Sequence, residues 1–421
     1  MKEIRPRAPI HATVPVPGSK SITHRALIAA SLAQGKSLLK NHLECEDTLY
    51  TMDALRSLGI SMEKNGDDLL IMGSGGRFPI MPEERTLYLG NSGTSLRLLL
   101  SVTGLGRGAY VLTGTPRMQE RPIGSLVNAL RQLGVDVSCV NGNGCPPVHV
   151  RAKGIPGGKA TLDGSESSQF VSSLLLSGPY AEKGVDVAVK GSLVSRPYVD
   201  ITLDVMERFG ARVYREGYGR FKVAPGQAYG ARTFHVQGDA SSASYFWAAA
   251  AVTGGAVITK NIHPFETRQG DIRFLELLAG MGCSIDKRAD RVTVRGGALS
   301  GIEADMSGMP DMVPTLAAVA LFAGGETVIQ HVAHLRYKES DRLGSVSEEW
   351  GRIGARIEER KDGLTVFGGG KLRGAVVHPH QDHRLAMALA VIGLRVPGIQ
   401  IEDEACVHKS FPNFWELWDK L

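Results

Sequence analysis

The stretch Ser21–Gly35, SITHRALIAASLAQG, sets the pattern for the whole chain. It begins with polar residues, continues as an Ala/Leu-rich helix and ends at a glycine, and a β-branched strand is expected after such a turn. The same plan recurs roughly every 72 residues, which predicts a stacked repeat architecture rather than one irregular core. The other five stretches are Thr94–Gly108, Ser168–Gly184, Ser241–Gly255, Met312–Gly325 and His383–Leu394.

A second helix and two short strands follow each of the first five stretches. Apolar residues at i, i+3, i+4 and i+7 predict a half-buried helix, and a glycine marks where it stops. These glycines are Gly59, Gly134, Gly210, Gly282 and Gly354. Alternating segments around NG, DG or Gly-rich turns then predict hairpins. We therefore expect an α/β (α+β) protein of six β-α-β-α-β-β units, with a shorter sixth ending SFPNFWELWDKL.

The units divide naturally into three plus three. Polar segments PGSK (residues 17–20) and QGDASS (residues 237–242) stand at the two ends of the first block. If the N-terminal strand pairs with the last units, the chain crosses between two lobes at these places, which would form a hinge. The expected lobes are residues 18–237 and residues 1–17 plus 238–421, with helix N-termini facing the cleft between them.

Composition favours a protein that acts on small acidic molecules. Lys+Arg exceeds Asp+Glu by 48 − 43 = 5, and no basic run indicates nucleic-acid binding. Five cysteines show neither CxxC nor a Cys/His metal spacing, so we expect no metal, no cofactor and a reducing cytoplasm. The first residues lack the apolar core of a signal peptide, and no apolar stretch is long enough to span a membrane.

Cations and hydroxyls cluster at the helix starts of the first half. Lys20, Ser21 and Arg25 follow a Pro/Gly turn, and Arg25 can fork onto phosphate or carboxylate. In LGNSGTSLRLLL, Gly90 and Gly93 leave backbone N–H groups open to an anion, and we expect Thr94 to cap the helix that carries Arg97. Three further segments add Arg117 with Arg121, Ser167–Gln169, and Ser195 with Arg196 and Tyr198.

The second half adds carboxylates to the cations. Asp311 stands at the fifth helix start, RYKESDRLG holds Lys338, Glu339 and Arg342, and Asp382, His383 and Arg384 open the sixth. Capped helices, an exposed Arg–Glu pair or a solvated turn would explain each segment singly. Because all occur at equivalent places in the repeat, together they predict a site for two anionic substrates with proton transfer by Asp311 and Glu339.

Ten motifs, in order, resemble those of the 5-enolpyruvylshikimate-3-phosphate (EPSP) synthase family over essentially the full chain. They are PGSKSITHRAL, LGNSGTSLR, TGTPRMQERPIG, SSQF, SRPYVDIT, GDASSASYF, PDMVPT, RYKESDRL, QDHRLAM and KSFPNFW. The resemblance implies a two-lobed inside-out α/β barrel with three units per lobe. It also implies transfer of the enolpyruvyl group of phosphoenolpyruvate to the 5-hydroxyl of shikimate 3-phosphate, in aromatic amino acid biosynthesis.

The resemblance also assigns residues. Shikimate 3-phosphate contacts would come from Lys20, Ser21, Arg25, Ser167, Ser168, Gln169, Ser195, Tyr198, Asp311, His334 and Lys338. Phosphoenolpyruvate contacts would come from Lys20, Gly93, Arg121, Gln169, Arg342, Arg384 and Lys409. Asp311 is the candidate base on the hydroxyl and Glu339 the candidate proton carrier, although these two roles could be exchanged. Lys20 and Lys338 would stabilise charge and shuttle protons.

Two positions depart from the family pattern: His334 where members often have Asn, and Ser92 where others have Ala. Gly93 is retained, and a side chain there would crowd the phosphoenolpyruvate site. We therefore expect glyphosate to compete with phosphoenolpyruvate. We also expect a cytoplasmic monomer that binds neither nucleic acid nor membrane.

Two other interpretations stay open at this point. One is the related transferase that acts on UDP-N-acetylglucosamine with a loop cysteine as acid, but residues 117–123 contain no cysteine. The other is a non-catalytic anion- or RNA-binding repeat protein, which would not need Asp311 and Glu339.

Overall fold

The computed structural model describes residues 1–421, which form two compact units. Unit 1 comprises Met1–Ser19 and Gln237–Leu421, and unit 2 comprises Lys20–Val236. The chain therefore passes between units after Ser19 and after Val236, two residues later and one residue earlier than the expected boundaries. None of the helices has both the length and the apolar character that a bilayer crossing requires.

Unit 2 contains three copies of one strand and helix order. The first copy is α1 (Lys20–Leu32), β3 (Gln34–Lys40), α2 (Glu46–Ser57), β4 (Ser61–Asn65) and β5 (Asp68–Ser74). The second is β6 (Arg85–Tyr88), α3 (Gly93–Gly104), β7 (Arg107–Thr113), α4 (Gly124–Gln132), β8 (Asp136–Cys139) and β9 (Val148–Lys153). The third is β10 (Gly158–Asp163), α5 (Ser168–Ser177), β11 (Val185–Lys190), α6 (Pro197–Arg208), β12 (Val213–Glu216) and β13 (Arg220–Val223), followed by β14 (Thr233–His235).

Unit 1 repeats the order with a shortened last copy. It opens with β1 (Lys2–Ile4) and β2 (His11–Pro15), and resumes with α7 (Ala240–Thr253), β15 (Ala256–Lys260), α8 (Phe274–Gly280), β16 (Ser284–Lys287) and β17 (Arg291–Arg295). Next come β18 (Glu303–Asp305), α9 (Val313–Ala320), β19 (Glu326–Gln330), α10 (Arg342–Arg352), β20 (Arg356–Arg360) and β21 (Gly363–Phe367). The last copy is β22 (Val376–Val377), α11 (His383–Gly393), β23 (Ile399–Ile401) and α12 (Phe414–Trp418).

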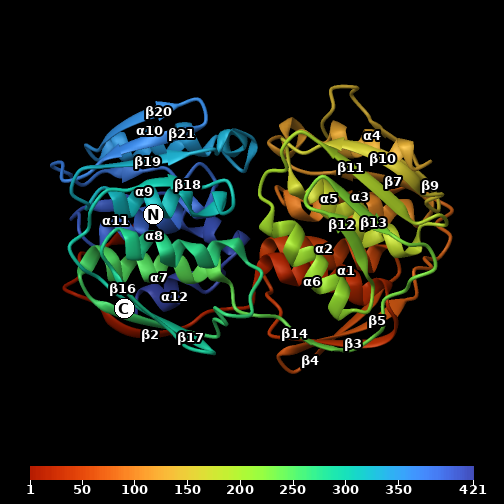
Figure 1. Cartoon of the computed structure of the whole chain (residues 1–421), viewed down its shortest axis with the longest axis horizontal. Helices are drawn as coiled ribbons and strands as arrows, with labels where there is room; N and C mark the ends of the chain where they lie inside the picture. The colour runs from red at the N-terminus through yellow and green to blue at the C-terminus, as the bar shows by residue number, and fades with distance from the viewer. The chain divides into compact units, whose positions relative to one another are not determined.

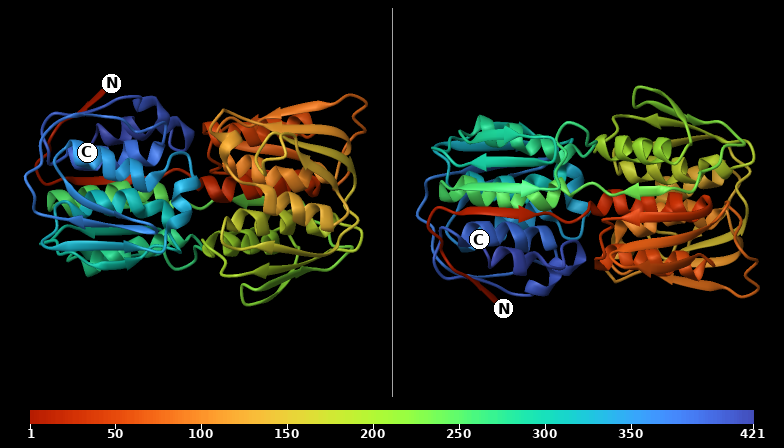
Figure 2. Two further views of the ribbon diagram at one scale, coloured as in Figure 1. Left: turned by 90° about the horizontal axis from the view of Figure 1, so that it is seen from above. Right: turned by 90° about the horizontal axis from the view of Figure 1, so that it is seen from below.

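Each full copy builds a four-stranded sheet in the same order. In β6-β7-β9-β8, the first two strands are parallel and the last two form an antiparallel hairpin. The hairpins expected around the Gly-containing turns are present, as in β4–β5, where Asn65 faces Asp68 across a two-residue turn. The shortened copy has no hairpin of its own, and β1 adds antiparallel to β23 instead. This pairing brings the first and last strands of the chain together (Figure 2).

The opening strands of the first and fourth copies are exchanged. β2 leads into α1 of unit 2, yet it pairs with β15 of unit 1. Conversely, β14 leads into α7 of unit 1, yet it pairs with β3 of unit 2. A Gly18–Gly238 bridge and a 2.8 Å bond from Ser19 N to Gln237 O join the two chain segments in unit 1 where they leave it.

Three helices form the centre of each unit. α1, α3 and α5 contact one another in unit 2, and α7, α9 and α11 do so in unit 1 (Figure 1). Nearly every residue of these helices is buried, which explains why their sequences are apolar on all sides rather than along one stripe. Because packing leaves no room for solvent along these helices, their charged residues lie in the first two turns, as Lys20, Arg25, Arg97 and Arg384 do.

Candidate active site

In unit 2 a buried arginine links two helix starts. Arg25 on α1 donates from Nε to Thr202 Oγ1 at 2.7 Å, from Nη1 to Ser21 O at 2.8 Å and from Nη2 to Tyr198 O at 3.0 Å. These partners are hydroxyl and carbonyl oxygens, so they orient the guanidinium without neutralising its charge. Burial lowers the pKa of Arg25 to about 10, and the group stays cationic at neutral pH. Such an arginine suits a dianionic ligand.

Lys20 begins α1 and is tied to a carboxylate. Its Nζ lies 2.8 Å from Asp47 Oδ2, and both side chains are largely buried. Asp47 lies in the first turn of α2, where the helix dipole favours a negative charge. The ion pair fixes the direction of the lysine side chain.

A polar network joins α3 to α5. Arg97 donates from Nη1 to Gln169 Oε1 at 3.0 Å, and Gln169 Nε2 donates to Thr94 Oγ1 at 2.9 Å. Ser167 caps α5 by accepting the Gln169 backbone N–H at 3.3 Å. The amide of Gln169 is therefore held from both ends, which presets its orientation.

Gly93 leaves room for an arginine. Arg121 is 4% exposed, and its Nη1 donates to Asn91 O and Oδ1 at 3.1 and 3.2 Å. A Cβ built on Gly93 would lie 2.6 Å from Nη2 of Arg121 and 2.7 Å from its Cζ. Real Cβ atoms do not approach so closely, so any side chain at position 93 would displace this guanidinium.

The other residues expected from unit 2 lie at helix starts as well. Ser21 is the second residue of α1, Ser168 the first residue of α5, and Ser195 comes just before α6. Ser195 has the unusual φ of +52°, and its carbonyl accepts the Tyr198 backbone N–H at 3.1 Å. Arg117, in contrast, forms an exposed pair with Glu120 at 2.9 Å, so only Arg121 of the two expected guanidiniums is buried.

In unit 1 one arginine collects three carboxylates. Arg342, the first residue of α10, is 1% exposed. Its Nη1 lies 2.7 Å from Asp311 Oδ1, its Nη2 lies 2.8 Å from Glu339 Oε2, and its Nε lies 2.7 Å from Asp382 Oδ2. The starts of α9, α10 and α11 are thereby joined at one point. Burial lowers the pKa of Arg342, but the three carboxylates raise it by more, so the charge is permanent.

Asp311 is shared between two arginines. Its second oxygen, Oδ2, lies 2.7 Å from Arg384 Nη2. Burial raises the pKa of Asp311, but Arg384, Arg342 and Lys338 lower it by more, so the pKa falls well below its usual range. Asp311 is thus an ionised carboxylate at neutral pH, able to accept a hydrogen bond.

A second acidic residue near Asp311, Asp271, has a raised pKa rather than a lowered one. Asp271 accepts a hydrogen bond from the Ser241 hydroxyl and is 4% exposed. Burial, reinforced by the charge of Asp311, raises the pKa of Asp271 to about 7. Tyr245 on α7 is also buried here, 3.4 Å from Arg384 Nη1. Unit 1 therefore holds carboxyl groups whose pKa values differ strongly.

The remaining expected residues of unit 1 come from two 3-10 helices. His334 lies within Ala333–Tyr337, Lys338 and Glu339 follow directly, and Lys409 ends Glu404–Lys409 at 5% exposure. Burial and the charge of Lys338 lower the pKa of His334 to about 3. The imidazole is therefore neutral, and it can offer a hydrogen bond but no charge.

The structure corrects one expectation and adds several residues. Thr94 does not cap α3: the cap is Ser92, whose hydroxyl accepts the Ser95 N–H at 3.4 Å, and Thr94 binds Gln169 instead. The partners Asp47, Thr202, Tyr245 and Asp271 were not predicted from the sequence. Asp47 and Asp271 each lie at a polar helix start, in ECEDT and QGDIR, and that position is the signal that could have found them.

Comparison with known proteins gives one consistent result. Residues 4–418 match the family model described as EPSP synthase (3-phosphoshikimate 1-carboxyvinyltransferase). The chain is 50% identical to a 3-phosphoshikimate 1-carboxyvinyltransferase of Methanoculleus marisnigri, covering 97% of this chain and 96% of the relative. It is 45% identical to the protein of that name from Syntrophobacter fumaroxidans, covering 100% and 99%. A solved structure of EPSP synthase from Acinetobacter baumannii is similar, with a TM-score of 0.83, 30% identity and coverage of 99% and 97%.

Proposed function

Because the chain belongs to the EPSP synthase family, we propose that the side chains described above bind its two substrates and move its protons. The enzyme transfers the enolpyruvyl group of phosphoenolpyruvate to the 5-hydroxyl of shikimate 3-phosphate and releases phosphate, a step of aromatic amino acid biosynthesis. The fold supports the family assignment, since each unit carries three copies of the repeat.

Shikimate 3-phosphate is the ligand that we assign to the hydroxyl-rich helix starts. The buried charge of Arg25, which is bound only by neutral oxygens, supports a role in binding the phosphate. Hydroxyl and amide groups at helix N-termini suit phosphate oxygens and ring hydroxyls. The assigned residues are Lys20, Ser21, Arg25, Ser167, Ser168, Gln169, Ser195, Tyr198, Asp311, His334 and Lys338.

We assign phosphoenolpyruvate to a second set of residues, which contains three arginines. A guanidinium fork matches both a carboxylate and a phosphate, and Gly93 keeps the space that the guanidinium of Arg121 needs. The assigned residues are Lys20, Gly93, Arg121, Gln169, Arg342, Arg384 and Lys409. Arg342 and Arg384 are already paired with Asp311, so their positions do not depend on the ligand.

The chemistry moves protons in both of its steps. The 5-hydroxyl attacks C2 of phosphoenolpyruvate and gives up its proton, while C3 gains one to form a tetrahedral intermediate. The C2–phosphate bond then breaks and C3 loses a proton, which releases phosphate. We assign Asp311 to the hydroxyl and Glu339 to C3, with Lys20 and Lys338 stabilising the developing charge.

One observation carries this assignment: Asp311 accepts from Arg342 and Arg384 through separate oxygens, 2.7 Å from each. The two arginines keep Asp311 ionised and fix its orientation, so it is poised to accept a hydrogen bond from a substrate hydroxyl. Glu339 is bound through one oxygen to Arg342. The alternative is that Asp311 and Glu339 exchange these roles. Comparing the pH–rate profiles of an Asp311 variant and a Glu339 variant would distinguish the two assignments.

We further propose that glyphosate competes with phosphoenolpyruvate and that the enzyme is a cytoplasmic monomer. The competition is supported by the close approach of Gly93 and Arg121. The cytoplasmic location is supported by the five free cysteines, and the monomeric state by two units that each have their own core. Inhibition kinetics would test the competition with phosphoenolpyruvate. The molar mass measured by light scattering would test whether the enzyme is a monomer. Activity that is unaffected by millimolar glyphosate would contradict the first.

The decisive experiment measures phosphate released from phosphoenolpyruvate with two acceptors. Shikimate 3-phosphate should support turnover, and UDP-N-acetylglucosamine should not. The inverse result would assign the chain to the related transferase. Binding of both ligands without phosphate release would indicate a binding protein.

A further inference from the structure

Helix α10 holds the segment His378–Asp382 at two places. Arg342 begins the helix, and Glu349 lies seven residues later, which is two turns along the same face. At the first place, Arg342 Nε lies 2.7 Å from Asp382 Oδ2. At the second, Glu349 bonds to His378 and His380. One helix face therefore fixes both ends of a five-residue segment.

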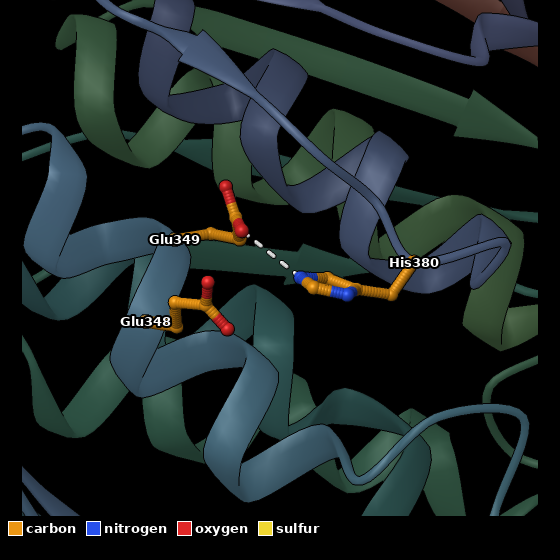
Figure 3. A group of neighbouring side chains, drawn as sticks. All are labelled: Glu348, Glu349 and His380. Atoms are coloured by element: carbon orange, nitrogen blue, oxygen red, sulfur yellow. Dashed lines mark hydrogen bonds and ion pairs between the residues drawn. The ribbon is translucent and has the colours of Figure 1, made fainter.

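Glu349 is a fully buried carboxylate. Its Oε2 accepts the backbone N–H of His378 at 2.9 Å, and its Oε1 lies 2.9 Å from the His380 Nε2 (Figure 3). Arg352 Nε also lies 3.3 Å from Oε1. A buried carboxylate is unfavourable unless its oxygens are bound, and here both oxygens are bound. Most of these bonds fix the segment rather than the helix that carries Glu349.

The segment needs such support because its backbone is strained. His380 and Gln381 have φ values of +52° and +55°, and two successive non-glycine residues rarely adopt this left-handed conformation. Strain of this kind persists only where surrounding contacts impose it. The next residue, Asp382, caps α11 by accepting the Arg384 N–H at 3.0 Å and also binds Arg342. The strained turn therefore sets where Asp382 lies.

The same side chains resemble a metal site, but their contacts argue against one. Glu348, Glu349 and His380 offer ligand atoms within 4.8 Å of one another. The guanidinium of Arg352 already lies 2.7 Å from Glu348 Oε1 and 3.3 Å from Glu349 Oε1. A cation is thus present among these carboxylates, and a divalent ion would have to displace it.

We propose that Glu349 is a positioning residue for the transfer reaction. It imposes the turn at His380 and Gln381, the turn places Asp382, and Asp382 orients Arg342 and the start of the helix that carries Arg384. This inference rests on the proposed function, in which those two arginines bind phosphoenolpyruvate. Loss of Glu349 should therefore weaken phosphoenolpyruvate binding more than shikimate 3-phosphate binding, because the two arginines act on the latter ligand through Asp311.

The test compares Glu349→Gln with Glu348→Gln, which removes a neighbouring but exposed carboxylate. Steady-state constants are measured for both substrates, with rates normalised to the folded fraction. For Glu349→Gln the phosphoenolpyruvate KM should rise about tenfold, since small misplacements of binding groups have effects of this size or larger. The shikimate 3-phosphate KM should rise by a smaller factor, because Arg342 and Arg384 act on that ligand through Asp311. Glu348→Gln should match the parent enzyme, because its side chain bonds to Arg352 and not to the segment.

Arg384→Lys separates the two levels of the proposal, because lysine keeps the charge and loses the fork. If Arg384→Lys leaves the phosphoenolpyruvate KM unchanged, the ligand assignment fails. If Arg384→Lys raises it while Glu349→Gln does not, only the inference about Glu349 is overturned. Equal effects of Glu348→Gln and Glu349→Gln, together with inhibition by EDTA that Zn²⁺ reverses, would establish a metal site and overturn it as well.

A milder variant covers the case in which Glu349→Gln does not fold. His380→Ala removes one of the contacts to Glu349 from a side chain that is one-third exposed. It should raise the phosphoenolpyruvate KM in the same direction by a smaller factor. An unchanged KM in a folded His380→Ala protein would overturn the inference.

Discussion

A Cβ atom on Gly93 would lie 2.6 Å from Nη2 of Arg121. The glycine and the arginine therefore depend on each other, since the guanidinium occupies the space that any larger residue at position 93 would need. Arg121 is held on its other side by Asn91. It cannot retreat without losing those bonds.

Gly93→Ala should consequently raise the phosphoenolpyruvate KM, by about tenfold if the displaced guanidinium loses roughly 1.4 kcal/mol of binding. The glyphosate concentration for half-inhibition should rise as well, because we expect both anions to use Arg121. Gly351→Ala is the matched control, since its Cβ would meet open space near the C-terminal end of α10. Unchanged kinetics for Gly93→Ala would separate Arg121 from phosphoenolpyruvate binding.

Asp311→Asn tests the proton-accepting role. The change removes the negative charge between two arginines and preserves the shape, so phosphoenolpyruvate should still bind in calorimetry. Turnover should fall by about 10²–10⁴-fold, the usual contribution of a general acid or base. Asp53→Asn, at an exposed pair with Arg56, serves as the control. Substantial turnover by Asp311→Asn would mean that another group accepts the hydroxyl proton.

Asp271→Asn tests the raised pKa through stability. The folded pKa of Asp271 is about 7, whereas the unfolded carboxyl titrates at 3.8, so between these values the unfolded chain binds fewer protons than the folded one. The stability contribution of this group therefore falls as pH rises from about 4 to about 7. Asn does not titrate, so its advantage over the parent should grow by about 2–3 kcal/mol between pH 5 and pH 8.

Thermal unfolding of both proteins at the two pH values measures this difference. Parallel pH dependence of the two melting temperatures would show that Asp271 is ionised throughout. The test needs no substrate, so its result does not depend on the proposed function.

His334→Asn tests whether the histidine matters as a charge. Because the pKa of His334 is about 3, the imidazole is neutral throughout the working range. Asn can supply a comparable neutral hydrogen bond, so the shikimate 3-phosphate KM should change by less than about threefold. The kcat/KM profiles of the two proteins between pH 5.5 and pH 8 should have the same shape. A profile that loses an ionisation near pH 6 in the variant would contradict this pKa.

The repeat and its hairpins were predictable because their signals are local. The Ala/Leu-rich helices, the glycine stops and the two-residue turns each lie within about fifteen consecutive residues. Side-chain partners are not local: Arg25 meets Thr202 on α6, and Lys20 meets Asp47 on α2. The prediction that Thr94 caps α3 was wrong, because Ser92, two residues earlier, also carries a hydroxyl that suits a cap and takes that position. The raised pKa of Asp271 arises from burial, which no short motif encodes.

The exchanged strands have a consequence for synthesis on the ribosome. Unit 2 is one continuous stretch, Lys20–Val236, so it can complete its sheets as soon as β14 has emerged. β2 has to wait for β15, because His11 pairs with Ala256. For the whole time that unit 2 is translated, the first residues of the nascent chain remain without their partner strand. Early folding should therefore begin in residues 20–236, and pulse proteolysis of stalled chains should find these residues protected before residues 1–19.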